Sequence, residues 1–184
     1  MSNAAFLVDG HLEQKFIQRT CFCRPVRRIN CNGRNVAISV IAKRIATQCR
    51  LLGNRCHPII VIIDREDRLE TSRELSSSLL DYLRKEGIID TFIIGVADRM
   101  IENWILADAE IVNHHESNIK ATPPYSEGCN GKNVLERCLD HYHETTIGVE
   151  LLLNCRASRI NENSQSFSDF FNQLPENDCS WLKN

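Results

Sequence analysis

The sequence predicts an α/β fold, in which a four-stranded, mainly parallel, doubly wound sheet carries a C-terminal helical extension. Strand and helix patterns alternate along the first two thirds of the chain with short connections, as in doubly wound sheets. The run 58–63 is apolar throughout, which is typical of a strand buried on both faces of a parallel sheet. The length of 184 residues fits one domain with an appended segment. We therefore expect a core over residues 1–112 and, over 113–184, a loop and helices that pack on it.

The first half of the chain predicts two strands, each followed by a helix. A short apolar strand over 5–8 ends at Asp9, and apolar residues at helical spacing follow it. After a weaker strand, Asn35 is the expected N-cap of a long helix that ends at Gly53. The expected elements are strand 5–8, helix 11–22, strand 25–29 and the long helix after Asn35.

The second half repeats the pattern before it changes character. Gly87 stops a leucine-rich helix, and a proline- and glycine-containing stretch marks a long loop. The expected elements are strand 58–63, helix 70–86, strand 91–96, helix 101–108, loop 113–132 and helices near 133–143, 146–155 and 165–174.

Composition indicates a cytoplasmic globular protein. The hydrophobic content of 42% is ordinary, and no apolar run approaches the roughly 18 residues needed to span a bilayer. Asp9 interrupts the short N-terminal apolar patch, which argues against a secretory signal. Most of the nine cysteines are expected to be buried free thiols, because no C-x-x-C pair accompanies Cys21 and Cys23 to form a zinc site.

Carboxylates follow the first and third predicted strands directly. Asp9 follows the first strand, and Glu13 lies one helical turn later on the same face. Asp64, Glu66 and Asp67 follow the third strand. Because the carboxyl ends of parallel strands share one edge, we expect these side chains to meet there. Acids gathered in this way repel one another unless a proton or cation lies between them, which predicts a divalent-metal site.

A further acidic group follows the fourth strand. Asp98 and Glu102 are candidates to complete the coordination of a second ion, and Asp108 follows in the same helix. Two ions would suit phosphodiester cleavage, with one activating water and the other stabilising the leaving oxygen. The structural alternative is that each acid caps a helix or interacts with its dipole.

Basic residues are concentrated near the N-terminus. The net charge is −2, yet no acid occurs between Glu13 and Asp64. Arg27, Arg28 and Arg34 in this block are candidates to bind a nucleic-acid backbone. The alternative is that these bases pair with acids of the C-terminal half.

A near-repeat supplies one more basic candidate. Residues 31–36 read Cys-Asn-Gly-Arg-Asn-Val, and residues 129–134 read Cys-Asn-Gly-Lys-Asn-Val. Lys132 thus stands where Arg34 stands, each before a predicted helix. Turn chemistry explains the pattern, and a phosphate cradle at a helix N-terminus is the functional alternative.

Motifs of other phosphate and ester chemistries are missing from the sequence. It contains no G-x-S-x-G, no G-x-x-x-x-G-K-S/T and no G-x-G-x-x-G. A receiver-like signalling domain also places acids after its first and third strands, but it needs a lysine after a fifth strand, and no such strand is predicted.

Two motifs together resemble the TOPRIM domain of primases, topoisomerases and related nucleases. They are Val8-Asp9-Gly10-x-x-Glu13 and Ile62-Ile63-Asp64-x-Glu66. The resemblance implies a TOPRIM/Rossmann-like sheet and Mg²⁺, with Mn²⁺ as a substitute, held by Asp9, Asp64, Glu66 and Asp67. It implies Asp9, Glu13, Asp64, Glu66 and Glu102 as catalytic residues.

The segment Glu102-Asn103-Trp104-Ile105-Leu106-Ala107-Asp108 resembles the E-x-W-x-x-A-D segment of small stand-alone TOPRIM-like bacterial proteins. Their C-terminal pattern is echoed by Tyr142, Gly148 and the Phe-rich stretch 167–171. Because such proteins accompany ABC-type ATPases in anti-phage systems, the resemblance implies a DNA or RNA nuclease of antiviral defence with an ATPase partner. A homo-oligomer is also compatible with it.

Two positions depart from the family pattern. Asp9 stands where the family has Glu, and Glu66 stands where it has Asp. Both keep an oxygen ligand, so metal binding tolerates them better than catalytic geometry does. The alternative function is therefore a catalytically degenerate subunit that binds an ATPase partner.

Overall fold

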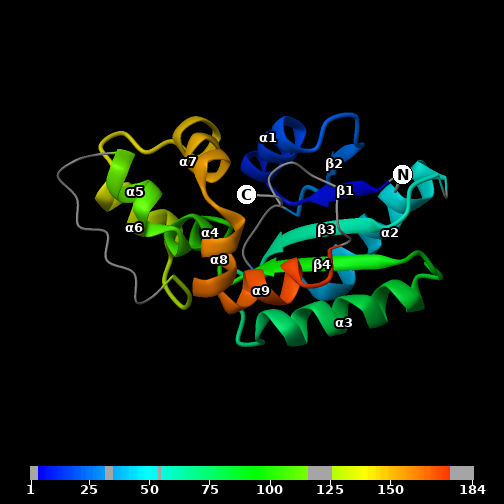
Figure 1. The fold of residues 1–184 in the computed structure, drawn as a ribbon. Coiled ribbons are helices and arrows are strands. Elements are labelled where there is room, and N and C mark those ends of the chain that lie inside the picture. The colour runs from blue at the N-terminus through cyan, green and yellow to red at the C-terminus, as the bar shows by residue number, and fades with distance from the viewer. Residues whose placement is uncertain (1–3, 32–34, 54, 116–125, 175–184) are drawn as a thin grey trace.

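A computed structural model of the chain describes residues 4–31, 35–53, 55–115 and 126–174. Within these ranges a parallel sheet has the order β2-β1-β3-β4 (Figure 1). The strands are β1 (Ala5–Val8), β2 (Val26–Arg28), β3 (Ile59–Asp64) and β4 (Phe92–Ala97). This arrangement confirms the predicted α/β fold. The chain reverses its direction of progress across the sheet between β1 and β3, which makes that position the topological switch point.

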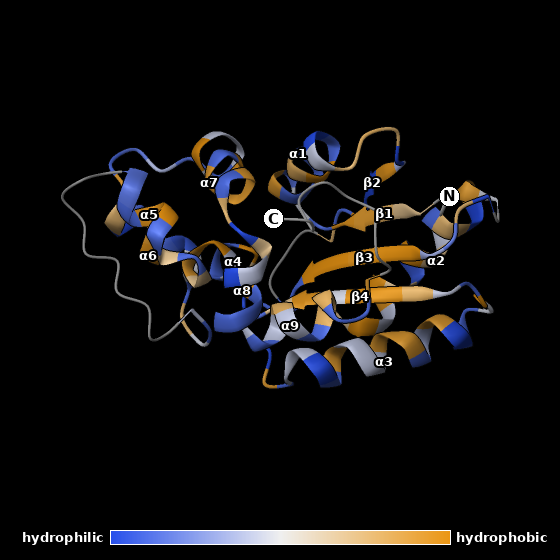
Figure 2. Cartoon of the chain, in the orientation of Figure 1, coloured by the Kyte–Doolittle hydropathy of each residue, from blue (hydrophilic) through white to orange (hydrophobic). Residues whose placement is uncertain are grey.

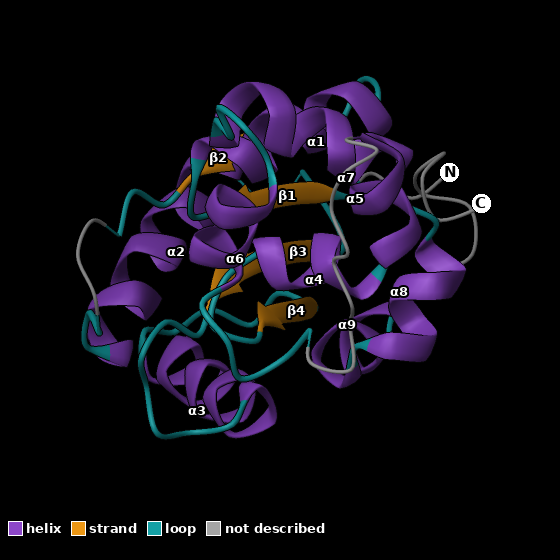
Figure 3. Cartoon of the chain, turned by 90° about the vertical axis from the view of Figure 1, so that its left-hand side faces the viewer, coloured by secondary structure: helices purple, strands orange, loops and turns teal. Residues whose placement is uncertain are grey.

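Helices cover both faces of the sheet, as Figure 3 shows from its carboxyl edge. Helix α1 (His11–Thr20) lies on one face with the C-terminal helices, and α2 (Ile38–Leu52) and α3 (Ser72–Lys85) lie on the other. Alternate strand residues feed the two cores: Phe6 and Val8 point to the α1 side, and Leu7 to the α2 side. Strand β3 is almost uniformly hydrophobic because both its faces are buried (Figure 2).

Helix caps explain where the predicted and observed boundaries differ. The expected N-cap Asn35 is wrong, because it has a left-handed backbone (φ 54°) and α2 begins at Ile38 after Ala37. Gly53 ends α2 in the left-handed conformation, as expected. Helix α3 begins at Ser72 and not at residue 70, because Thr71 and Glu74 form a reciprocal capping box.

The C-terminal part of the chain folds into short helices. They are α4 (Glu102–Ala107), α5 (Ala109–His115), α6 (Gly131–Cys138), the π-helix η1 (Glu144–Gly148), α7 (Val149–Asn154), α8 (Ala157–Asn163) and α9 (Gln165–Phe171). Of these, α9 packs on β4, and the others pack mainly on α1, on α4 and on one another. Helices α5 and α8 were not predicted, since neither has a long apolar stripe. The first residues of the predicted loop 113–132 belong to α5 and its last residues to α6, so the loop is shorter than predicted. Residues 116–125 lie outside the described residues.

Helix α9 is fixed to the sheet by aromatic packing. A Cβ at Gly95 of β4 would lie 2.8 Å from the ring of Phe170, so only glycine allows this approach. The Trp104 ring stacks on Phe170 at 5.7 Å and meets Phe167 edge-on at 5.1 Å. Residues of the sheet, α4 and α9 therefore share one hydrophobic core.

Two further expectations concern cysteines and membranes. Cys21 is disulfide-bonded, whereas Cys23 and Cys31 are among seven free thiols in the described ranges. In the same ranges, no helix has the length and apolar character that crossing a bilayer requires.

Candidate metal and phosphate site

Asp9 lies at the switch point, directly after β1. Its backbone N–H donates to Ile62 O at 3.2 Å, and its Oδ1 accepts from the Cys31 N–H at 3.1 Å. Burial raises the pKa of Asp9, while the Cys31 amide and the charges of Arg44 and Arg68 oppose that rise. Asp9 thus lies between a basic and an acidic environment.

Glu13 reaches the same edge from the first turn of α1. The residue is only 3% exposed. A Cβ at Gly10 would lie 2.5 Å from Glu13 Oε2, so the absence of a side chain at Gly10 makes room for the carboxyl group. Burial raises the pKa of Glu13 to about 8, against its backbone hydrogen bond and with the help of nearby Glu102, Asp9 and Glu144. Glu13 is therefore held where a proton or a cation must accompany it.

Asp64 ends β3 beside Asp9. Its Oδ1 is buried and has no hydrogen-bond partner within the described ranges. Burial raises its pKa well above the ordinary value, and the charges of Glu13, Glu102, Asp9 and Glu66 raise it further. An unsatisfied buried carboxylate oxygen is costly without a compensating partner.

Glu66 follows on a tight turn that the backbone fixes. It has a left-handed conformation (φ 60°), and its N–H donates to Arg99 O at 2.7 Å. Residues other than glycine rarely adopt this backbone conformation, so the turn that carries Glu66 is held at some conformational cost.

Glu102 approaches from the N-terminus of α4 and is also 3% exposed. The Tyr142 hydroxyl donates to Glu102 Oε1 at 3.2 Å. Burial raises the pKa of Glu102 to about 7, with the charge of Glu144 adding to it and Tyr142 and Lys132 opposing it. Lys132 Nζ in turn bonds Glu144 Oε2 at 3.1 Å.

A cavity of about 440 Å³ joins these groups. Among the described residues, seven carboxylates and one lysine line it. We call this lining the acidic pocket: Glu13, Asp64, Glu66, Asp67, Glu102, Glu136, Glu144 and Lys132. Glu13, Asp64, Glu66 and Glu102 thus line one cavity, whereas Asp9 is outside this lining and acts on Asp64 and Glu13 through its charge.

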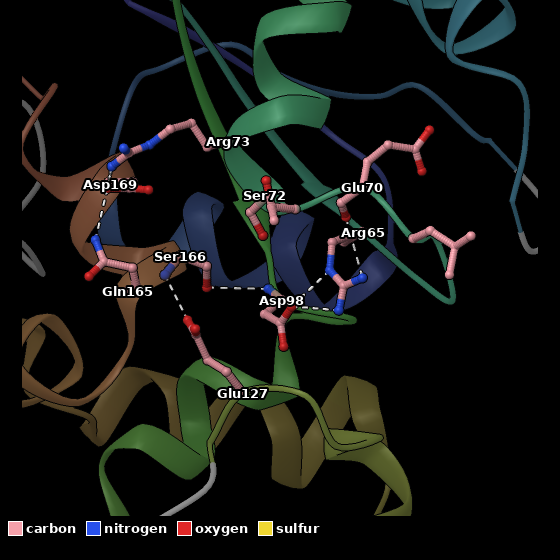
Figure 4. A pocket seen from close by; sticks show the side chains of 11 residues that line it. Arg65, Glu70, Ser72, Arg73, Asp98, Glu127, Gln165, Ser166 and Asp169 are labelled. Carbon is pink, nitrogen blue, oxygen red and sulfur yellow. Dashed lines mark hydrogen bonds and ion pairs between the residues drawn. The ribbon is translucent and has the colours of Figure 1, made fainter.

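Some predicted acids have other partners. Asp67 lines the acidic pocket but is ion-paired with Arg99. The expectation that Asp98 helps to hold a second ion is wrong. The Asp98 carboxylate pairs with Arg65 at 2.6 Å and accepts a hydrogen bond from the Gly128 N–H. Figure 4 shows Asp98 in a different cavity, of about 700 Å³, whose polar side chains bond one another.

Asp108, the third acid after β4, is also neutralised by other groups. It is 1% exposed, accepts from the Arg156 N–H at 2.8 Å and pairs with Arg159 at 3.3 Å. These partners neutralise the carboxylate and tie α4 to α8. The position of Asp98 and Asp108 after a strand could not show that Arg65 and Arg159 form ion pairs with them.

The predicted phosphate-binding bases are spread apart. Arg27 is exposed on the edge strand β2, and Arg28 Nη1 lies 2.7 Å from His11 Nε2. Lys132 lies in the acidic pocket at the N-terminus of α6, where Asn130 caps the helix by accepting from the Asn133 N–H at 2.9 Å. Arg34 lies outside the described residues.

Sequence reasoning missed Glu136, Glu144 and the role of the Tyr142 hydroxyl. A Cβ at Gly148 would lie 2.7 Å from the Tyr142 oxygen. Glycine at this position therefore leaves room for the Tyr142 hydroxyl. The spacing between Tyr142 and Gly148 was the available signal, but nothing in the sequence shows that the tyrosine meets Glu102.

The residues fit a hard divalent cation by their chemistry. Carboxylate oxygens are the ligands that Mg²⁺ and Mn²⁺ prefer, and the orphaned Asp64 oxygen lies among them. However, within the described ranges, no three His, Cys, Asp or Glu side chains already stand close enough together to hold an ion. Binding would therefore require the carboxylates to draw together.

Comparisons with family profiles, curated proteins and solved structures found no match.

Proposed function

We propose that this protein is a Mg²⁺-dependent nuclease that hydrolyses phosphodiester bonds of DNA or RNA, with Mn²⁺ able to replace Mg²⁺. One observation carries the proposal: Asp64 at the end of β3 shares a cavity with the buried Glu13 and Glu102 of two helices, and its Oδ1 has no hydrogen-bond partner among the residues that the structure describes. Such a cluster is stable only with protons or cations, and hard cations match its oxygen ligands.

The roles follow from position. Asp9, Asp64 and Glu66 would hold the metal, because they stand at the strand ends nearest the switch point. When bound, the cation would polarise a phosphate oxygen and supply a nucleophilic water. Glu13 and Glu102, with pKa values of about 8 and 7, would accept or donate protons near neutral pH. Tyr142 would orient Glu102 by its hydrogen bond.

The resemblance to small TOPRIM-like proteins suggests a biological role for the proposed nuclease. We place the protein as the effector of a bacterial anti-phage system with an ABC-type ATPase partner. Cleavage should then be measured both with the purified chain and with an ABC-type ATPase added as its proposed partner.

The test is cleavage of supercoiled plasmid and of tRNA in Mg²⁺, Mn²⁺ and excess EDTA. We expect EDTA to abolish cleavage and Asp64→Asn to lower the rate at least about 100-fold, because a metal ligand is lost. Asp81→Asn is the matched control, since Asp81 is exposed on α3 and pairs with Arg84 at 3.0 Å.

Calorimetric titration with Mg²⁺ separates the alternatives. Mg²⁺ binding that Asp64→Asn removes, without cleavage even beside the ATPase, would support the degenerate subunit. Cleavage that persists in Asp64→Asn would refute the site.

A further inference from the structure

Charges divide into two groups across the carboxyl edge of the sheet. Acids gather on the α1 and α4 side, where Glu13 and Glu102 are buried. Arginines lie toward the β2 edge of the sheet: Arg28 ends β2 and contacts His11 of α1, whereas Arg44 and Arg68 bond the carbonyls of Ile29, Asn30 and Val36 between β2 and α2. Asp9 lies at the boundary, because both groups act on it. The proposed nuclease needs such a boundary, with metal ligands on one side and phosphate-binding groups on the other.

The first member of the basic side is Arg28. It ends β2, in register with Val8 of β1, which directly precedes Asp9. Its Nη1 lies 2.7 Å from Nε2 of His11, the first residue of α1, which is exposed. A histidine side chain carries no negative charge, so this contact leaves the positive charge of Arg28 uncompensated.

Arg44 and Arg68 come from different elements and bind the segment after β2. Arg44 of α2 donates to Ile29 O at 3.3 Å and to Asn30 O, and Arg68 of the β3–α3 connection donates to Val36 O. Both guanidiniums bond neutral carbonyls. They lie close enough to Asp9 to oppose the burial-driven rise of its pKa. Their charge therefore acts on the metal-binding edge.

These arginines differ from others in the fold. Arg65, Arg73, Arg99 and Arg159 are each neutralised by a carboxylate in an ion pair. Within the part of the chain that the structure describes, Arg28, Arg44 and Arg68 take part in no such ion pair. Uncompensated guanidiniums next to a proposed phosphodiesterase site match the charge and fork geometry of phosphate groups.

We infer that His11, Arg28, Arg44 and Arg68 form a basic rim that binds the sugar-phosphate backbone of the nucleic-acid substrate and leads it over Asp9 into the acidic pocket. The inference rests on the proposed function. It assigns to this rim the backbone-binding role expected of Lys132, because Glu144 already neutralises Lys132 inside the pocket.

The test measures binding without cleavage. Fluorescence anisotropy of a labelled 20-nucleotide DNA strand, its duplex and the matching RNA is followed in EDTA from 50 to 300 mM salt. We expect Arg28→Gln/Arg44→Gln to weaken binding about 25-fold or more at 100 mM salt. The slope of log K against log salt should fall by about 0.7–0.9 for each phosphate contact removed.

Two further variants guard against a purely structural effect. Arg28→Lys/Arg44→Lys keeps the charge and should restore most of the affinity, even though it weakens the bonds to the carbonyls. The control Arg73→Gln/Arg84→Gln removes two exposed charges of α3, each paired with a carboxylate, and should leave affinity and salt slope unchanged. Thermal unfolding verifies that each variant is folded.

Failure of the rim and failure of the proposed function are distinguishable. Cleavage by the wild type with unchanged binding in the glutamine variant would overturn the rim and leave the nuclease standing. Salt-dependent binding that the rim variants weaken, without cleavage by any form, would keep the rim and overturn the nuclease. Equal loss in the rim and α3 variants would show a non-specific charge effect and overturn the rim.

Discussion

At the scale of single residues, the site combines predictable and unpredictable contributions. The placement of Asp9 and Asp64 at one edge of the sheet could be predicted, because parallel strands end there and each residue stands at the end of a predicted strand. Glu144 could not, since it reaches the acidic pocket from a π-helix some 80 residues later in the chain. The partners that remove Asp98 and Asp108 from the site are arginines, whose choice of acid depends on tertiary packing.

Glu13 gives a prediction on the pH dependence of stability. Its pKa rises from about 4.5 in the unfolded chain to about 8 in the folded protein, so the folded state holds the extra proton between these values. Stability without metal is therefore greatest below the unfolded pKa and falls as pH rises toward 8. We expect Glu13→Gln, which needs no proton, to be more stable than the wild type at pH 8.5 by a few kcal/mol and to gain little at pH 5.

Urea unfolding in EDTA at pH 5, 7 and 8.5 measures this difference. The exposed Glu150→Gln of α7 is the control and should show no pH-dependent difference from the wild type. Equal pH dependence in Glu13→Gln and the wild type would contradict a raised pKa of the buried Glu13 carboxyl.

At the scale of elements, the π-helix η1 links the extension to the site. Its backbone closes with the Gly148 N–H donating to His143 O at 3.1 Å, a wide turn of a kind that often marks functional sites. Gly148 leaves space for the Tyr142 hydroxyl, which bonds Glu102. Helical periodicity near residue 146 predicted a helix there, but a π-turn has no distinct sequence pattern. The element was predictable, and its function in holding Tyr142 was not.

A double-mutant cycle tests this link. Gly148→Ala should destabilise by about 1–3 kcal/mol, because its Cβ would lie 2.7 Å from the Tyr142 oxygen and 2.9 Å from Leu12 Cδ1. Tyr142→Phe should cost about 1 kcal/mol through the lost hydrogen bond. We expect the double variant to lose less than the sum, since removing the hydroxyl relieves the clash. Urea unfolding provides the four free energies, and strict additivity would show that Gly148 and Tyr142 do not interact.

At the scale of the whole molecule, the sheet and the C-terminal helices complete one site. Asp9 follows β1 and Asp64 ends β3, whereas Tyr142 and Glu144 come from the extension. The doubly wound sheet was predictable from its apolar strands. The docking of α9 was harder to predict, because it depends on Gly95 and on the fit of Trp104 to Phe167 and Phe170, which follow more than 60 residues later in the chain.

Phe167 tests whether the sheet and the extension unfold as a unit. Its side chain is fully buried against Trp104 of α4, and Trp104 stacks on Phe170 over β4. Phe167→Ala should therefore lower the free energy of unfolding by about 3–5 kcal/mol. Unfolding should remain one cooperative transition, with the same midpoint by far-UV circular dichroism and by tryptophan fluorescence. Phe22→Ala, at a side chain that is 75% exposed, should have little effect. Two separated transitions in Phe167→Ala would mean that the extension unfolds independently, and cleavage measured between them would then show whether the strand-end acids act without Tyr142 and Glu144.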